Sequence, residues 1–172
     1  MITLFEKFEN TPDVNSVSDK FWEMVEVANW NAVVKGYKGN PIVREDRQDF
    51  YKQAQNRIYS KYTFKEIENF NNEYHKIYTQ VYNYFEPIWL DEKYSDVMPS
   101  DDGYTDLISS LIGKGKKYTK ICIEHTGFFI QMARDDDYVE NFGYILNVDE
   151  DEYWEIKEEF DPLLKDVRKY NL

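Results

Sequence analysis

The sequence predicts an all-α protein, a compact single-domain bundle of about six or seven helices. Apolar residues recur three and four positions apart through most of the chain, which is the spacing of one helix face. Only 7 Gly and 5 Pro interrupt the 172 residues, and alternating segments joined by glycine-containing tight turns are missing. Because single cores usually close at roughly 100 to 200 residues, we expect residues 1–172 to form one domain.

The first expected helix begins after Ser16 or Ser18, because either hydroxyl can accept a hydrogen bond from a free backbone N–H of the first turn. We expect this helix to end at Gly36. Its predicted buried face consists of apolar residues three and four apart, namely Phe21, Trp22, Val25, Ala28 and Ala32.

Two longer helices are expected next. Asn40 followed by Pro41 marks the start of one that reaches about Tyr59, since the missing N–H of Pro is no loss in a first helical turn. Thr63 and Glu66 form a capping-box pattern at the start of the other. Its apolar stripe extends over about five turns and predicts burial against other helices: Ile67, Phe70, Tyr74, Ile77, Tyr78, Val81 and Phe85.

Pro87 is expected to stop or kink that helix, because a Pro removes one backbone hydrogen bond and crowds the preceding turn. A polar loop follows as far as Ser100. Asp101 or Asp102 then begins a short apolar helix that closes near Gly113.

The last third of the chain is also expected to be helical. A helix after residue 115 has a weak point at Gly127, although residues 128–132 are compatible with a strand. A further helix is expected from about Tyr138 to Leu146 and a last one from about Asp151 to Tyr170, with a break at Pro162.

The excess of acidic residues is concentrated near the C-terminus. The chain has 33 acidic and 21 basic residues, a net charge of −12, and residues 135–161 contribute twelve acids and one base, or −11 of that total. Such a field repels phosphate groups, so it excludes nucleic acids and anionic membrane surfaces as partners.

Other features of composition indicate the compartment. A single Cys rules out a disulfide framework and favours a reducing compartment. No stretch approaches the roughly 20 apolar residues that cross a bilayer, and the first ten residues do not resemble a secretory signal. We therefore expect a cytoplasmic protein with no membrane association, and the sequence does not predict its oligomeric state.

The acidic segments that contain aromatic residues are the leading candidate binding surface. Carboxylates around aromatic side chains are typical of a docking site for a basic protein, whereas the simpler interpretation is a solvated helix face. The spacing of these acids does not match a calcium-binding loop. The residues that we expect to contact a basic partner are Asp135, Asp136, Asp137, Asp149, Glu150, Asp151, Glu152, Tyr153, Trp154 and Glu155.

A second candidate motif is the sequence Asp101, Asp102, Gly103 and Tyr104. Adjacent carboxylates before a flexible residue are able to hold a hard cation or to act in catalysis. An acid at a helix start is favoured in any case by the free N–H groups and the helix dipole, and we favour that structural interpretation.

Cys122 and His125 are three residues apart, which on a helix places a thiol and an imidazole on one face. A Cys–His nucleophile pair is one interpretation, and a buried structural Cys is the favoured one. The other histidine, His75, is expected at the polar boundary of the long helix. Two ligands do not complete a zinc site, so we expect neither a metal nor a cofactor.

Several segments resemble the bacterial family named domain of unknown function 4240. Its characteristic segment is similar to Ser100–Tyr104 followed by Leu111, Ile112 and Gly115. Phe21–Val25 resembles the opening Phe-Trp helix of the family, and Glu66, Ile67 and Phe70 resemble its Glu-Ile-x-x-Phe helix. The resemblance covers about residues 21–118 and leaves an acidic helical part at about residues 135–172. It implies a helical bacterial domain and names no reaction, cofactor or substrate.

The favoured function is therefore a non-enzymatic interaction module that binds a basic partner, such as an immunity or antitoxin-like protein or a small regulatory adaptor. One alternative is a carboxylate- or metal-dependent hydrolytic enzyme that uses Asp101 and Asp102 with His125 or His75. Another is a structural or regulatory domain without a ligand, whose acidity keeps it in solution.

Overall fold

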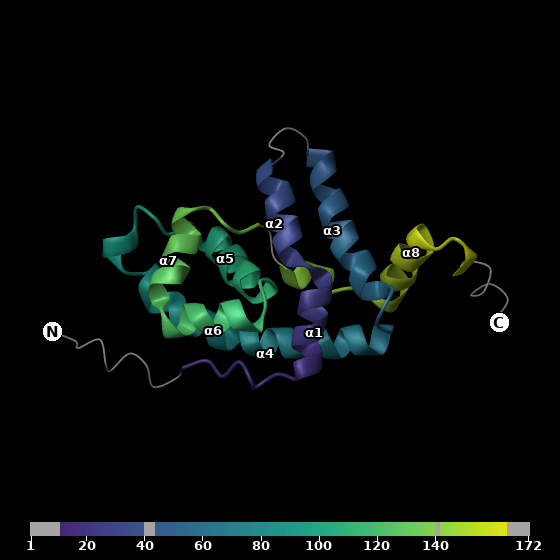
Figure 1. Ribbon diagram of the computed structural model, residues 1–172, viewed down its shortest axis with the longest axis horizontal. Coiled ribbons are helices and arrows are strands. Elements are labelled where there is room, and N and C mark those ends of the chain that lie inside the picture. The colour runs from purple at the N-terminus through teal and green to yellow at the C-terminus, as the bar shows by residue number, and fades with distance from the viewer. Residues whose placement is uncertain (1–10, 40–43, 140–141, 165–172) are drawn as a thin grey trace.

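The computed structural model describes residues 11–39, 44–139 and 142–164, and all regular structure among them is helical, which confirms the all-α class. The longest helix, α4, runs along the long axis of the molecule (Figure 1). Helices α5, α6 and α7 gather over its C-terminal half, α1 crosses it, α2 packs beside α3, and α8 lies at the end opposite α7. The α-helices are α1 (Asp19–Ala28), α2 (Trp30–Gly39), α3 (Arg44–Tyr59), α4 (Phe64–Trp89), α5 (Asp101–Gly113), α6 (Lys116–Glu124), α7 (Thr126–Arg134) and α8 (Glu150–Phe160), with the 3-10 helices η2 (Glu92–Tyr94) and η3 (Phe142–Ile145).

The single helix expected between Ser18 and Gly36 is two helices, because the chain breaks at Asn29. Asn29 has a left-handed backbone with φ 51°, a conformation that Asn tolerates better than most residues. The Arg57 guanidinium stabilises the end of α1 by donating two hydrogen bonds, of 2.6 and 3.1 Å, to the carbonyl oxygen of Ala28. The break buries Trp30 and leaves Ala32 exposed, so the prediction that Ala32 is buried is wrong.

The capping box of α4 is confirmed, and its predicted apolar stripe is buried except at Tyr78, which is half-buried. The Thr63 hydroxyl accepts a hydrogen bond from the Glu66 backbone N–H, and the Glu66 carboxylate accepts one from the Thr63 N–H. The helix continues two residues past Pro87 to Trp89, so Pro87 does not stop it. Trp89 stacks on Tyr104 with ring centroids 4.7 Å apart, and this contact stabilises the last turn.

Helix α5 is enclosed by the other elements and carries two fully buried serines. The Ser109 hydroxyl lies 2.7 Å from the Tyr74 hydroxyl, in hydrogen-bonding contact with α4. The Ser110 hydroxyl accepts hydrogen bonds from the Trp30 indole N–H at 3.2 Å and from the Val139 N–H at 3.1 Å. These bonds satisfy hydroxyl groups that would otherwise destabilise the core.

The C-terminal third differs from the prediction in two places. The segment that includes residues 128–132 is helical as favoured, but the chain breaks at His125 and not at Gly127. Among the described residues of the predicted helix over 138–146, the regular structure is the 3-10 helix η3, because the backbone of Val139 bonds to Ser110 instead of to a helical neighbour.

The end of α8 at Phe160, just before Pro162, confirms the predicted break. The predicted helix start at Asn40 and Pro41 and the extension of the last helix to Tyr170 lie outside the described residues.

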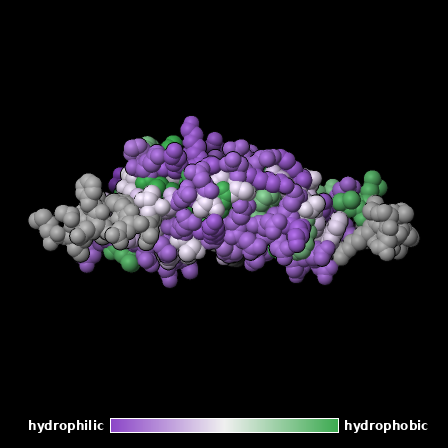
Figure 2. All heavy atoms as spheres, turned by 90° about the horizontal axis from the view of Figure 1, so that it is seen from below, coloured by the Kyte–Doolittle hydropathy of each residue, from purple (hydrophilic) through white to green (hydrophobic). Residues whose placement is uncertain are grey.

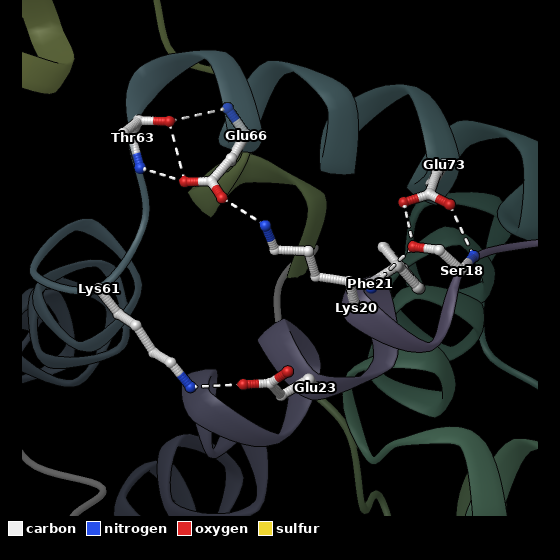
Figure 3. A network of polar contacts seen from close by, with 8 residues as sticks. All are labelled: Ser18, Lys20, Phe21, Glu23, Lys61, Thr63, Glu66 and Glu73. Carbon is white, nitrogen blue, oxygen red and sulfur yellow. Dashed lines mark hydrogen bonds and ion pairs between the residues drawn. The ribbon is translucent and has the colours of Figure 1, made fainter.

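A network of exposed charges ties α1 to the start of α4 (Figure 3). Lys20 pairs with Glu66, and Lys61 donates to Glu23 at 2.6 Å. The hydrogen bond from Lys20, together with those from the Thr63 hydroxyl and N–H, lowers the pKa of Glu66 from 4.5 to about 2. These pairs remain in contact with water, so each contributes little to the free energy of unfolding.

A substitution at Gly113 tests the packing of α2 on α5. A Cβ atom at Gly113 would lie 2.6 Å from Cδ1 of the buried Trp30, so Gly113→Ala is expected to destabilise the protein by about 1–3 kcal/mol. The matched control is Gly127→Ala in α7, where a Cβ meets no atom within 4 Å. Because Ala favours a helix over Gly, the control is expected to stabilise the protein by about 0.5 kcal/mol. Urea unfolding measures both, and equal effects would contradict the packing described here.

The charge of Glu66 is expected to make a pH-dependent contribution. A carboxyl group with a lowered pKa in the folded state stabilises the fold fully above pH 4.5, and this stabilisation is lost as the pH falls toward about 2. Glu66→Gln should therefore destabilise the protein by about 0.5 kcal/mol at pH 7, and the difference should shrink as the pH falls below 4.5. Glu68→Gln, at an exposed position of the same helix outside the capping box, is the control and should leave the thermal melt at pH 7 nearly unchanged.

Candidate functional site

Helix α8 is attached to the rest of the protein by Tyr153, which is 2% exposed. The Tyr153 hydroxyl donates a hydrogen bond of 3.0 Å to the carbonyl oxygen of Tyr62. Its ring packs against those of Tyr59 and Phe64, with centroids 5.3 and 5.7 Å away. The prediction that Tyr153 contacts a partner is therefore wrong, because the side chain belongs to the core.

The acidic residues at the start of α8 are exposed to solvent. Asp149 caps the helix, since its Oδ1 accepts a hydrogen bond of 2.9 Å from the Glu152 N–H. The helix dipole further stabilises carboxylates in this first turn. The exposed acidic residues that the sequence assigned to the binding surface here are Asp149, Glu150, Asp151, Glu152 and Glu155. Trp154 beside them is half-buried.

The second acidic group, Asp135, Asp136 and Asp137, does not join this surface. It follows α7, toward the other end of the long axis from α8 (Figure 1). The Asp137 carboxylate accepts a hydrogen bond of 2.7 Å from Lys114, whose side chain is 5% exposed. The expectation that both acidic groups contribute to one binding surface is therefore wrong, because Val139 and η3, which lie between the two groups, pack on α5.

Bases of the chain itself neutralise only part of the α8 surface. Lys52 donates to Glu159 at 2.8 and 3.1 Å. Lys157 donates to the Tyr153 hydroxyl at 3.0 Å and lies over the rings of Tyr153 and Trp154. Within the described part of the chain, Glu150, Glu152 and Glu155 form no ion pair. We call these three residues the α8 acidic face.

A pocket of about 350 Å³ adjoins α8 where its C-terminal end meets that of α3. Its lining combines polar and apolar side chains, namely Asn56, Ser60, Lys157, Phe160, Asp161 and Leu164. Sequence analysis missed these residues. One available signal was the position of Phe160, seven residues after Tyr153 and so on the same side of the helix.

The motif at residues 101–104 begins α5. Asp101 and Asp102 are exposed, and Oδ1 of Asp101 accepts a hydrogen bond of 3.0 Å from the Asp102 N–H. Tyr104 is fully buried, and its hydroxyl donates to the carbonyl oxygen of Tyr82 at 2.7 Å. A Cβ atom at Gly103 would lie 2.6 Å from Cβ of Pro99. These contacts favour the structural interpretation, a helix start with a core tyrosine.

The Cys122 thiol is buried and not activated. Burial raises its pKa to about 12, and the charge of Lys114 opposes this only in part. His125 is exposed in the break between α6 and α7, and His75 is exposed on α4. Among residues 11–39, 44–139 and 142–164, no group of three or more His, Cys, Asp or Glu side chains is arranged to hold a metal ion.

Comparisons with known proteins assign no family to the chain. No family model matches it, and neither a curated protein nor a solved structure shows significant similarity. The resemblance to the family of domain 4240 stays a prediction. None of the helices in the described part of the chain is both long and apolar enough to cross a membrane.

The reactivity of Cys122 distinguishes a buried thiol from a nucleophile. Because the thiolate is the reactive form and burial disfavours it, labelling of the folded protein by a disulfide reagent at pH 8 should be at least roughly a hundredfold slower than in guanidinium. His125→Ala should leave the rate unchanged. Fast labelling of the folded protein that depends on His125 would contradict this and would support a Cys–His nucleophile pair.

Proposed function

We propose that the protein is a non-enzymatic interaction module that binds a basic protein partner through the α8 acidic face. The observation that supports this most directly is the attachment of α8 by the buried Tyr153 while Glu150, Glu152 and Glu155 remain in solvent. A field of one sign speeds encounter with a partner of the opposite sign and rejects partners of the same sign. A surface of this kind is suited to selecting a basic protein.

In its finer form, the proposal is that the chain is a bacterial immunity or antitoxin-like protein that covers a cationic surface of a toxin. A small regulatory adaptor would use the same face. The resemblance to the family of domain 4240, which names no reaction, is compatible with either role. The hydrolytic alternative depends on Asp101 and Asp102, and the start of α5 gives both residues a structural explanation.

Binding of a basic probe tests the proposal. A labelled peptide of alternating Lys and Ser should bind the full chain at low salt and dissociate as salt is added. The combined substitutions Glu150→Gln, Glu152→Gln and Glu155→Gln should weaken binding roughly tenfold, since exposed ionic contacts contribute about 0.2–1 kcal/mol each. Asp149 is left in place, so that the cap of α8 and the thermal melt are preserved.

The matched control carries Glu26→Gln, Glu68→Gln and Glu92→Gln, three exposed positions on α1, α4 and η2. Both triple variants raise the net charge by three, from −12 to −9. The control should keep the affinity of the unmodified chain within roughly twofold. Equal losses in the two variants would show attraction to net charge alone, and no binding at all would favour a domain without a partner.

A further inference from the structure

We infer that the pocket between the ends of α3 and α8 receives one apolar side chain from the basic segment that the α8 acidic face attracts. This inference rests on the proposed function and adds the chemistry of the partner: a basic segment with one apolar anchor. The pocket adjoins the helix that bears the acidic face, because Lys157, Phe160 and Asp161 all belong to the C-terminal end of α8 or directly follow it.

The shape and lining of the pocket suit a single side chain. At about 350 Å³ it is at the small end of ligand sites, with room for one aliphatic or aromatic group. Phe160 and Leu164 supply apolar contact, and Asn56 and Ser60 form the α3 side. The side-chain amide of Asn56 makes no hydrogen bond among the described residues, so this group is available to the backbone of a bound segment.

Apolar side chains are exposed around the pocket. Phe160 is 39% exposed. Leu163, three residues later, is 75% exposed. Figure 2 shows apolar side chains at the α8 end of a mainly hydrophilic face. An exposed apolar group with a charged rim is the arrangement of an interface hot spot, in which a central anchor binds and the rim excludes water.

Charge complementarity favours a basic partner segment over a second copy of this chain. A second copy would bring its own net charge of −12 and its own acidic α8 against these carboxylates, and the repulsion would oppose association. The cation in the lining, Lys157, is already in contact with the protein, through the 3.0 Å hydrogen bond that it donates to the Tyr153 hydroxyl and through the Trp154 ring. Asp161 in the lining adds a further carboxylate for a basic residue beside the anchor.

Two peptides of equal charge test the inference: the Lys–Ser peptide described above, and the same peptide with its central Ser replaced by Leu. The Leu peptide should bind the full chain at least roughly tenfold more tightly, because burial of one Leu side chain supplies that difference. Ser60→Trp, which fills the pocket from an exposed position, should abolish the advantage of Leu while the Lys–Ser peptide binds as before. Phe160→Ser should reduce the advantage, and Phe128→Ser on α7, where the Phe is 52% exposed, should not.

The other possible results separate failure of the pocket inference from failure of the proposed function. If the Lys–Ser peptide binds but Leu gives no advantage, the pocket inference is wrong and the proposed function stands. If neither peptide binds, the proposed function fails. Equal effects of Phe160→Ser and Phe128→Ser would mean non-specific apolar contact, which contradicts the inference. Self-association that Ser60→Trp abolishes would identify a second copy as the occupant and would also contradict it.

Discussion

The burial of two serines in α5 is the constraint on which the arrangement of the other helices depends. A buried hydroxyl without a hydrogen-bond partner would destabilise the folded state, because the group loses its bonds to water and gains none in return. Ser109 therefore forms a hydrogen bond with Tyr74 of α4. Ser110 forms hydrogen bonds with Trp30 of α2 and with the backbone of Val139. Apolar packing alone permits helices to slide or rotate, whereas these directional bonds fix the register of both helices against α5.

The same bonds position the segment that leads to the acidic helix. After Val139 is drawn onto α5, the chain passes through η3, and the Tyr59 hydroxyl donates a 2.8 Å hydrogen bond to the carbonyl oxygen of Ile145. Tyr153 then docks against Tyr59 and Phe64 and sets the rotation of α8 about its own axis. The exposure of the carboxylates thus follows from the burial of Tyr153 on the same helix and from the hydroxyl groups of α3 and α5 that position the chain before it.

Features set by neighbouring residues could be predicted from the sequence, and features set by distant contacts could not. The cap at Thr63 and the stripe of α4 are local and periodic, so they are recognisable. The break at Asn29 is hidden, because the apolar spacing continues across it and only the packing of Trp30 on α5 requires a turn there. Which side of α8 faces inward, and the pocket that its end forms with α3, depend on residues far apart in the sequence.

The attachment of α8 through Tyr153 separates the requirements of folding from those of recognition. Substitutions on the solvent side of this helix, away from the cap at Asp149, remove no buried contact and change the free energy of unfolding by only about 0.5 kcal/mol. Such positions can change in charge and size while the buried contacts are kept. Under the proposed function, variants of this chain can therefore differ in binding preference and still melt at nearly the same temperature.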